Sequence, residues 1–140
     1  MIVQTACTVF KYNVLSGAED FNSPSPYVYK IALYTANADL NSGTVAYTTT
    51  EEITGTGYTA GGKTLTPTIG SDSADGVAYV SFSNVTWNPA SFTCRGALIY
   101  NSTTGAAVAV LNFGSDKTAA TSFTIQFPSA TSTSAILRIN

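Results

Sequence analysis

Short runs of β-branched and aromatic residues recur along the chain, and each is ended by Gly, Pro, Asn, Asp or Ser. Within several runs apolar and polar positions alternate, which is the period-two pattern of a strand with one buried face. In 76–83, for example, Ala78, Val80 and Phe82 form the more apolar face. The runs that predict strands are 27–35, 76–83, 92–101, 107–114, 123–128 and 135–140.

The segments between these runs have the composition of turns. "NSTTG" (101–105) predicts a hairpin loop, while 114–122 and 128–134 are expected to link the later strands. The stretch 37–76 is the least regular third of the chain and has room for two short strands. Roughly seven or eight short strands separated by turns predict an all-β fold, an antiparallel, jelly-roll-like β-sandwich. No domain boundary is visible, so residues 1–140 are expected to form a single domain.

One segment near the N-terminus has a helical pattern. In 8–17, Phe10, Val14 and Leu15 fall on one helical face, and Gly17 stands where a C-terminal cap is expected. The β-branched residues of this segment also allow a strand. We expect one short N-terminal helix, followed by a loop.

Charged residues make up only 10% of the 140 residues, against about 25% in typical soluble domains. Twenty-two Thr and fifteen Ser must therefore supply much of the polar surface. A surface with so few charges is poorly protected against self-association, which suits a protein packed against partners and equally an extracellular chain. The six basic and eight acidic residues are scattered and give a net charge of -2. Because no basic stripe is present, we do not expect nucleic-acid binding.

Cys7 and Cys94 are the only cysteines. Two isolated cysteines are neither a disulfide framework nor a metal-ligand cluster, so two free, buried thiols are favoured, and a pairing stays open. The first residues lack a basic leader with a long apolar run, so no signal peptide is expected. No stretch approaches the ~20 apolar residues of a membrane span. We expect a protein made in a cytoplasm, with no membrane partner.

The stretch "GYTAGGKT" satisfies the phosphate-loop pattern G-x-x-x-x-G-K-[ST] at Gly57, Gly62, Lys63 and Thr64. A true phosphate loop leaves a buried strand and runs directly into a helix. Here the preceding residues are polar and charged, and a Pro and a Gly soon afterwards forbid a helix of any length. The nucleotide-binding match is therefore interpreted as false.

A Gly-rich turn is the better interpretation of residues 57–64. Gly57, Gly61 and Gly62 are expected to supply backbone conformations that side chains forbid. The turn would reverse the chain after 51–56 and return Leu65 to the core.

Candidate catalytic groups are few. Histidine is absent, which excludes Ser–His and Cys–His nucleophile pairs and His metal ligands. Paired carboxylates could hydrolyse glycosides, and the candidates are Glu51, Glu52, Asp72, Asp75 and Asp116. The two Glu are adjacent and should point to opposite faces, whereas the Asp lie in turn-like contexts. "SDSADG" (71–76) lacks the alternating acids of a calcium loop. We expect no enzyme, no catalytic residues, no metal site and no cofactor.

Tyr58, Trp87 and Tyr100 are the aromatic residues singled out for binding. A sugar-stacking platform is one interpretation. Single aromatic residues in β-proteins more often fill the core or a subunit interface, so we favour one of these two places for the three residues and name them as possible interface residues.

Several motifs occur together and in a fixed order: an "ALYT" strand, a "GYTAGG" turn followed by Leu, a Trp before "RGALIYN", and "AVLNFGSDK" ahead of an "FP" strand. The opening "FKYNVLSGAEDF" (10–21) reads as a short helix ending in Gly. In this combination, which covers nearly the whole chain, the sequence resembles a group of small virion proteins of tailed bacteriophages and prophages. Some members of that group are similar to capsid cement, or decoration, proteins, which are all-β subunits that clamp neighbouring capsomers.

The resemblance implies a structural role without catalysis. It does not identify the part of the virion. Our hypothesis is a capsid cement protein, made in the host bacterial cytoplasm, that lies on the capsid exterior of the virion and has the major capsid protein as partner. We also expect a homo-oligomer, first of all a two-fold dimer, because closed two-fold contacts are the commonest. The terminal segments and 37–76 are the expected contact regions, since loops carry binding. The alternatives are a tail-associated or receptor-binding module, which would be trimeric with a glycan pocket, and, more distantly, a hydrolase.

Overall fold

The computed structural model describes residues 1–140 as a mostly β protein with one short N-terminal helix. The strands form antiparallel sheets of five, three and two strands, so the predicted all-β class and the N-terminal helix are confirmed. The elements are β1 (Thr5–Ala6), α1 (Thr8–Ser16), β2 (Tyr29–Tyr34), β3 (Lys63–Thr64), β4 (Pro67–Asp72), β5 (Val77–Phe82), β6 (Val85–Trp87), β7 (Phe92–Asn101), β8 (Ala107–Ala119), β9 (Phe123–Ile125) and β10 (Leu137–Ile139).

Helix α1 ends where its sequence predicts. Gly17 is left-handed, with φ 79°, and the N–H of Ala18 donates to the carbonyl of Asn13 at 2.8 Å, which closes the last turn. Phe10 is buried in the core, as its helical face requires. Leu15, expected on the same face, is instead 89% exposed. The helix therefore covers the core with only part of its apolar face.

The largest sheet has the strand order β1-β8-β7-β2-β3, and all its pairings are antiparallel. The middle of this sheet is buried on both faces: in β2 the residues Ile31 to Tyr34 are all buried. A strand covered on both faces has no exposed side that would select polar residues, so "IALY" is a continuous apolar run. β7 and β8 are joined by the predicted loop 101–105, in which Asn101 Oδ1 accepts the N–H of Thr103 at 3.0 Å.

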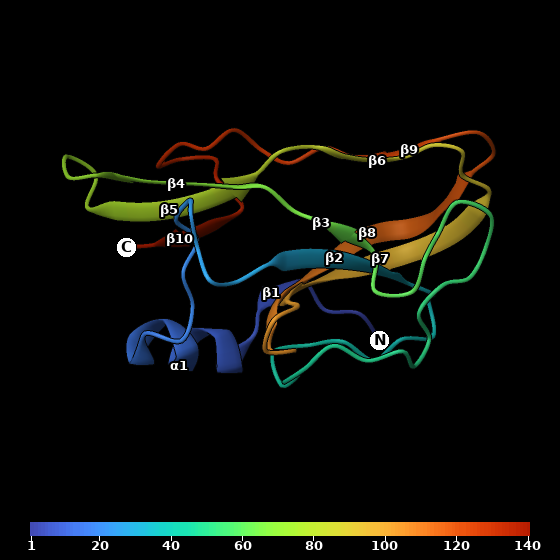
Figure 1. Cartoon of the computed structure of the whole chain (residues 1–140), viewed down its shortest axis with the longest axis horizontal. Coiled ribbons are helices and arrows are strands. Elements are labelled where there is room, and N and C mark those ends of the chain that lie inside the picture. Colours follow the sequence, from blue (N-terminus) through green and yellow to red (C-terminus); the bar gives the residue numbers. More distant parts are fainter.

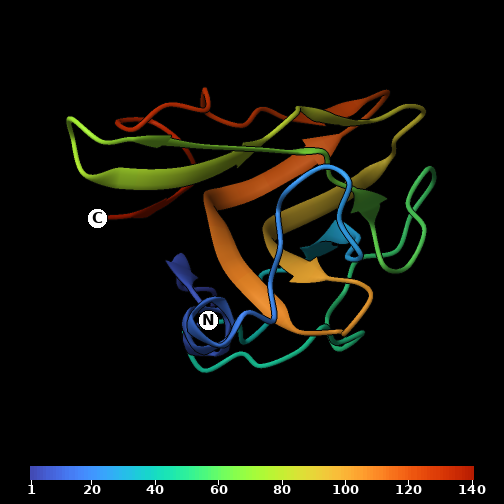
Figure 2. The same ribbon diagram turned by 60° about the vertical axis from the view of Figure 1, so that its left-hand side comes forward.

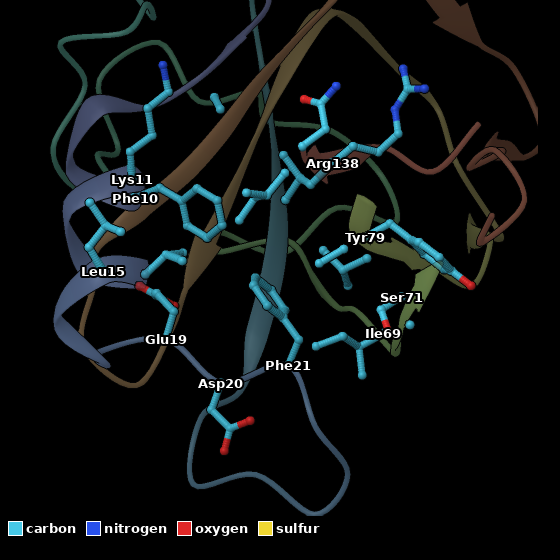
Figure 3. Close-up of a pocket in the computed structure, with 18 of the residues that line it drawn as sticks. Phe10, Lys11, Leu15, Glu19, Asp20, Phe21, Ile69, Ser71, Tyr79 and Arg138 are labelled. Carbon is cyan, nitrogen blue, oxygen red and sulfur yellow. The ribbon is translucent and has the colours of Figure 1, made fainter. Parts of the chain in front are cut away.

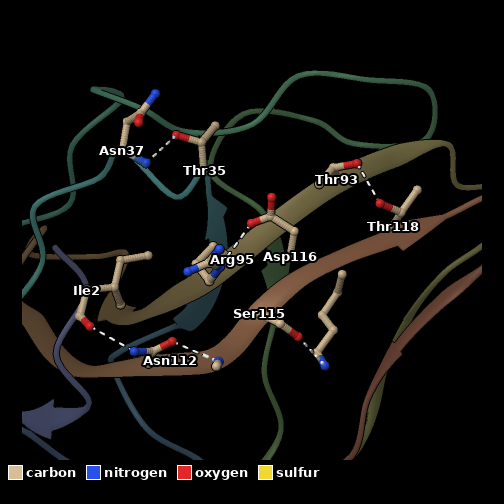
Figure 4. A network of polar contacts seen from close by, with 11 residues as sticks. Ile2, Thr35, Asn37, Thr93, Arg95, Asn112, Ser115, Asp116 and Thr118 are labelled. Carbon is tan, nitrogen blue, oxygen red and sulfur yellow. Dashed lines mark hydrogen bonds and ion pairs between the residues drawn. The ribbon is translucent and has the colours of Figure 1, made fainter.

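The expected connector 114–122 is wrong, because β8 continues through Ala119. The pairing of β7 with β8 shifts between Cys94 and Gly96, so that 113–116 form an irregular segment opposite Arg95. Arg95 Nε donates to Asp116 Oδ1 at 2.9 Å across this irregularity (Figure 4). The polar side chains that suggested a loop point to solvent, while the backbone pairs with β7 on both sides of the irregularity.

The two smaller sheets have the strand orders β10-β5-β4 and β6-β9. In Figure 1 the first extends to one end of the molecule beside α1, and the second lies above the five-stranded sheet. Strand β5 departs from the expected alternation: Ala78 is exposed, whereas Ser81 is buried and donates to the carbonyl of Pro128. One hydrophobic cluster joins all three sheets and α1, as Phe82 and Trp87 illustrate. The first residues of β5, Val77 to Tyr79, are not buried in this core, and Ala78 and Tyr79 line the groove described below.

Candidate functional site

The "GYTAGGKT" loop does not have the geometry of a phosphate loop. Lys63 and Thr64 form β3, which pairs with β2, and the next element is strand β4 rather than a helix. Lys63 Nζ donates to the carbonyl of Thr86 at 2.7 Å and lies 5.9 Å from the centre of the Trp87 ring. No helix N-terminus faces the loop, so the amide cradle that holds phosphate is not formed here.

The three glycines of the loop all have positive φ: 85° at Gly57, 94° at Gly61 and 78° at Gly62. Two of them also lie against the backbone of another strand or loop. A Cβ at Gly57 would stand 1.8 Å from the carbonyl oxygen of Pro89, and one at Gly62 would stand 1.7 Å from that of Ile31. These positions are therefore closed to side chains by contact as well as by conformation.

Glu52 organises the loop from inside. Its Oε1 accepts the hydroxyl of Tyr47 at 2.6 Å, and its Oε2 accepts the hydroxyl of Tyr58 at 2.6 Å and the N–H of Gly61 at 2.8 Å. Hydrogen bonds to a carboxylate are stronger than those between neutral groups. From the sequence alone, Glu52 is only a weak catalytic candidate. Nothing in the local pattern indicates that the hydroxyls of Tyr47 and Tyr58 contact it.

The tyrosines around Glu52 form a second part of this arrangement. Tyr100 stacks on Tyr47 with ring centres 4.6 Å apart, and its hydroxyl donates to the carbonyl of Gly61 at 2.7 Å. Burial, and next the charge of Glu52, raise the pKa of Tyr100 to about 12. Burial followed by the hydrogen bond to Glu52 likewise raises the pKa values of Tyr47 and Tyr58. These hydroxyls stay protonated and remain donors at neutral pH.

The proposed interface aromatics lie inside the chain. Trp87 is 1% exposed and Tyr100 4% exposed, so the structure places both in the core rather than at a surface that a partner could reach. Tyr58 is half-buried, with its ring 6.0 Å from that of Phe92 and 6.3 Å from that of Trp87. The Gly-rich turn folds Tyr58 back towards Glu52, whose carboxylate accepts its hydroxyl.

The remaining carboxylates have local roles. Asp72 Oδ1 accepts the N–H of Ala74 at 2.9 Å in the β4–β5 turn, and Ser132 Oγ donates to Asp75 at 2.8 Å. Asp116 pairs with Arg95, while the hydroxyl of Thr35 donates to Glu51 at 2.6 Å. No three of the Asp, Glu and Cys side chains come together in a group that could hold a metal ion.

Both cysteines are free and buried in the structure. Burial raises the pKa of Cys7 to about 11, with Lys11 acting weakly in the opposite sense, and burial with the nearby charge of Asp116 raises the pKa of Cys94 to about 12. Their ordinary pKa is 9.0. In the folded chain both thiols are therefore protonated and shielded at neutral pH.

We expect these thiols to make stability fall with rising pH. Above about pH 9 the unfolded chain releases the thiol protons while the folded chain keeps them, so the free energy of unfolding falls up to about pH 11 to 12. Urea unfolding at a series of pH values measures this. A Cys7→Ala, Cys94→Ala double variant should lose part of the slope, the rest coming from the buried tyrosines. Fast labelling of either thiol in the native protein by a thiol reagent would contradict the interpretation.

A groove of about 780 Å³ lies at the other end of the molecule, between α1 and the β10-β5-β4 sheet. Its floor is made by the buried side chains of Phe10, Phe21 and Val80. Three of its rim residues are large, apolar and exposed: Leu15, Ile69 and Ile139, at 89%, 48% and 57%. No pattern in the sequence marked this groove, since its walls come from the two ends of the chain and from β4 and β5 in between.

The structure contains no helix with the length and apolar character that crossing a bilayer requires. No family model, no curated protein and no solved structure matches this chain.

Proposed function

We propose that this chain is a phage capsid cement, or decoration, protein, made in the host bacterial cytoplasm. It binds the outer surface of the icosahedral head and clamps neighbouring major capsid protein subunits. The proposed identity of the protein rests on the order of motifs in the sequence. Its finer fold description, a jelly-roll-like sandwich, rests on the single core shared by the three sheets.

The observation that carries the proposal is where the exposed apolar side chains lie. Large apolar side chains that stay in contact with water are available for a partner to cover. Outside the groove beside α1, four of the five in this chain fall in the two terminal segments or in 37–76, the regions expected to make contacts: Met1, Val3, Tyr12 and Val45. Few charges oppose such contacts, since only 10% of the residues are charged.

The physical basis of the activity is linkage. A protein that binds the assembled shell but not free subunits lowers the free energy of the shell, and each further copy adds to the effect. This role needs many identical weak sites and no chemistry. The core residues and the turn around Glu52 then serve to hold the contact segments in place.

The test is co-sedimentation of the purified chain with undecorated capsids. We expect binding at hundreds of copies per particle and a higher temperature of capsid disruption, on the order of several degrees for a contribution of a few kcal/mol. Failure to co-sediment, or binding at only a dozen copies or fewer, would remove the cement proposal and favour the tail-associated alternative.

Two variants with matched exposure locate the contact. Val3 and Val28 are both 45% exposed, but only Val3 lies in a terminal segment. Val3→Asp should weaken capsid binding roughly tenfold or more, as expected when a charge is buried at an interface, while Val28→Asp should leave it unchanged. Equal effects would show that exposure alone, and not the segment, determines binding.

A further inference from the structure

We propose that the groove between α1 and the β10-β5-β4 sheet is the docking surface for a second copy of this chain, in a two-fold dimer. This gives the expected homo-oligomer a defined surface and does not depend on binding to a capsid. Figure 2 shows α1 and the end of the β10-β5-β4 sheet at the same side of the molecule.

The sheet wall of the groove is built by strand register. Ile69 of β4, Val80 of β5 and Leu137 of β10 are partners in one row across the sheet. The next row on the same face is formed by Ser71, Ala78 and Ile139. Because side chains two residues apart in a strand share a face, these rows form one continuous, mainly apolar surface.

The helix wall faces this surface. Phe10 forms part of the floor, with its ring 5.9 Å from that of Phe21, and Leu15 stands at the rim. Leu15 is 89% exposed although it lies on the apolar face of α1. Covering apolar surface lowers the free energy, so both walls of the groove are stabilised by contact with a partner.

The charges of the groove are separated along its length. Lys11 and Arg138 lie towards one end and Glu19 and Asp20 towards the other (Figure 3). None of the four takes part in an ion pair within the chain, whose only two ion pairs join Met1 to Asp39 and Arg95 to Asp116. The groove thus has a basic and an acidic end, both without a charged partner.

This polarity makes the groove complementary to itself. A two-fold axis that lies in the interface and crosses the groove reverses its direction, so the basic end of one copy meets the acidic end of the other. The same operation forms that contact twice and lets the exposed rim residues Leu15 and Ile139 of each copy be covered by the other. The net charge of -2 adds little repulsion between copies. A second copy therefore covers the apolar walls and places an opposite charge against each charged end.

The first test is the mass of the full chain in solution, measured by light scattering and sedimentation velocity. We expect a dimer for the native chain, and a dissociation constant at least tenfold higher for Leu15→Asp and for Ile139→Asp. Val45→Asp is the matched control, since Val45 is 65% exposed but lies outside the groove. Circular dichroism and thermal unfolding test whether each variant is folded. We expect that they are, because both groove substitutions replace exposed side chains.

The second test uses the charges. Lys11→Glu and Asp20→Lys should each raise the dissociation constant several-fold. The double variant should restore dimerisation in part, because position 11 of one copy and position 20 of the other again carry opposite charges, while Arg138 and Glu19 are unchanged. A monomer at every concentration, or a dimer that no groove substitution affects, would overturn the proposal, as would capture of capsid protein by this groove in place of a second copy. A monomer that still binds capsids would reject only the dimer, and a groove dimer that ignores capsids would reject only the cement role.

Discussion

Replacing Gly62 with Ala is expected to lower the free energy of unfolding by about 3 kcal/mol or more, or to prevent folding altogether. The added Cβ would stand 1.7 Å from the carbonyl oxygen of Ile31 and 2.9 Å from the Cα of Ala32. Both atoms belong to the backbone of β2, which is paired on both sides within the five-stranded sheet. Since the sheet cannot move locally without losing these pairings, the loop must leave its position.

Gly17 provides a matched control for this experiment. Its φ of 79° is nearly the same as the 78° of Gly62, but a Cβ there meets nothing within 4 Å. Gly17→Ala therefore measures backbone strain alone, about 1 kcal/mol. Urea unfolding of the two variants separates strain from contact. Similar losses in both would show that the approach of the loop to β2 is not what makes Gly62 necessary.

Glu52→Ala is expected to have the second largest effect, a loss of about 2 to 4 kcal/mol in the free energy of unfolding. The substitution removes the acceptor for the hydroxyls of Tyr47 and Tyr58 and for the N–H of Gly61. Each buried donor that loses its partner costs about 1 to 3 kcal/mol, and partial exposure of the tyrosines lowers the sum. Denaturant titration measures the loss.

The neighbouring carboxylate makes the comparison direct. Glu51 is exposed, and its side chain accepts one hydrogen bond, from Thr35. Its φ of 62° strains the backbone to the same extent with Glu or with Ala, because both residues carry a Cβ. Glu51→Ala should therefore change stability by only about 0.5 kcal/mol. If the two variants were equally destabilised, Glu52 would not be the centre of the turn.

Features that depend on neighbouring residues were predictable. The end of α1 at Gly17 follows from the chemistry of helix termination, and the 101–105 loop follows from turn residues between two apolar runs. The false nucleotide match was also recognisable, since the required helix is excluded by the residues after Lys63. In each case the deciding interactions are separated by only a few positions in the chain.

Predictions failed where strand pairing overrides composition. Segment 114–119 has the residues of a loop but continues β8, because its backbone finds partners on β7. Ser81 is buried despite its polarity, since its hydroxyl reaches a carbonyl 47 residues away, at Pro128. Conversely, Leu15 has the position of a core residue but no element of the same chain covers it. Apolar character indicates a preference for burial without specifying which surface provides it.

The pattern of the residues alone established a mostly β chain of short strands with one capped helix, low charge and a Gly-rich turn. The role of Glu52, the burial of Trp87 and Tyr100, and the groove beside α1 depended on the folded arrangement. The physical reason is the distance along the chain over which each interaction acts. Periodicity, capping and backbone conformation act between near neighbours, whereas these three features are made by side chains that only the pairing of distant strands brings together.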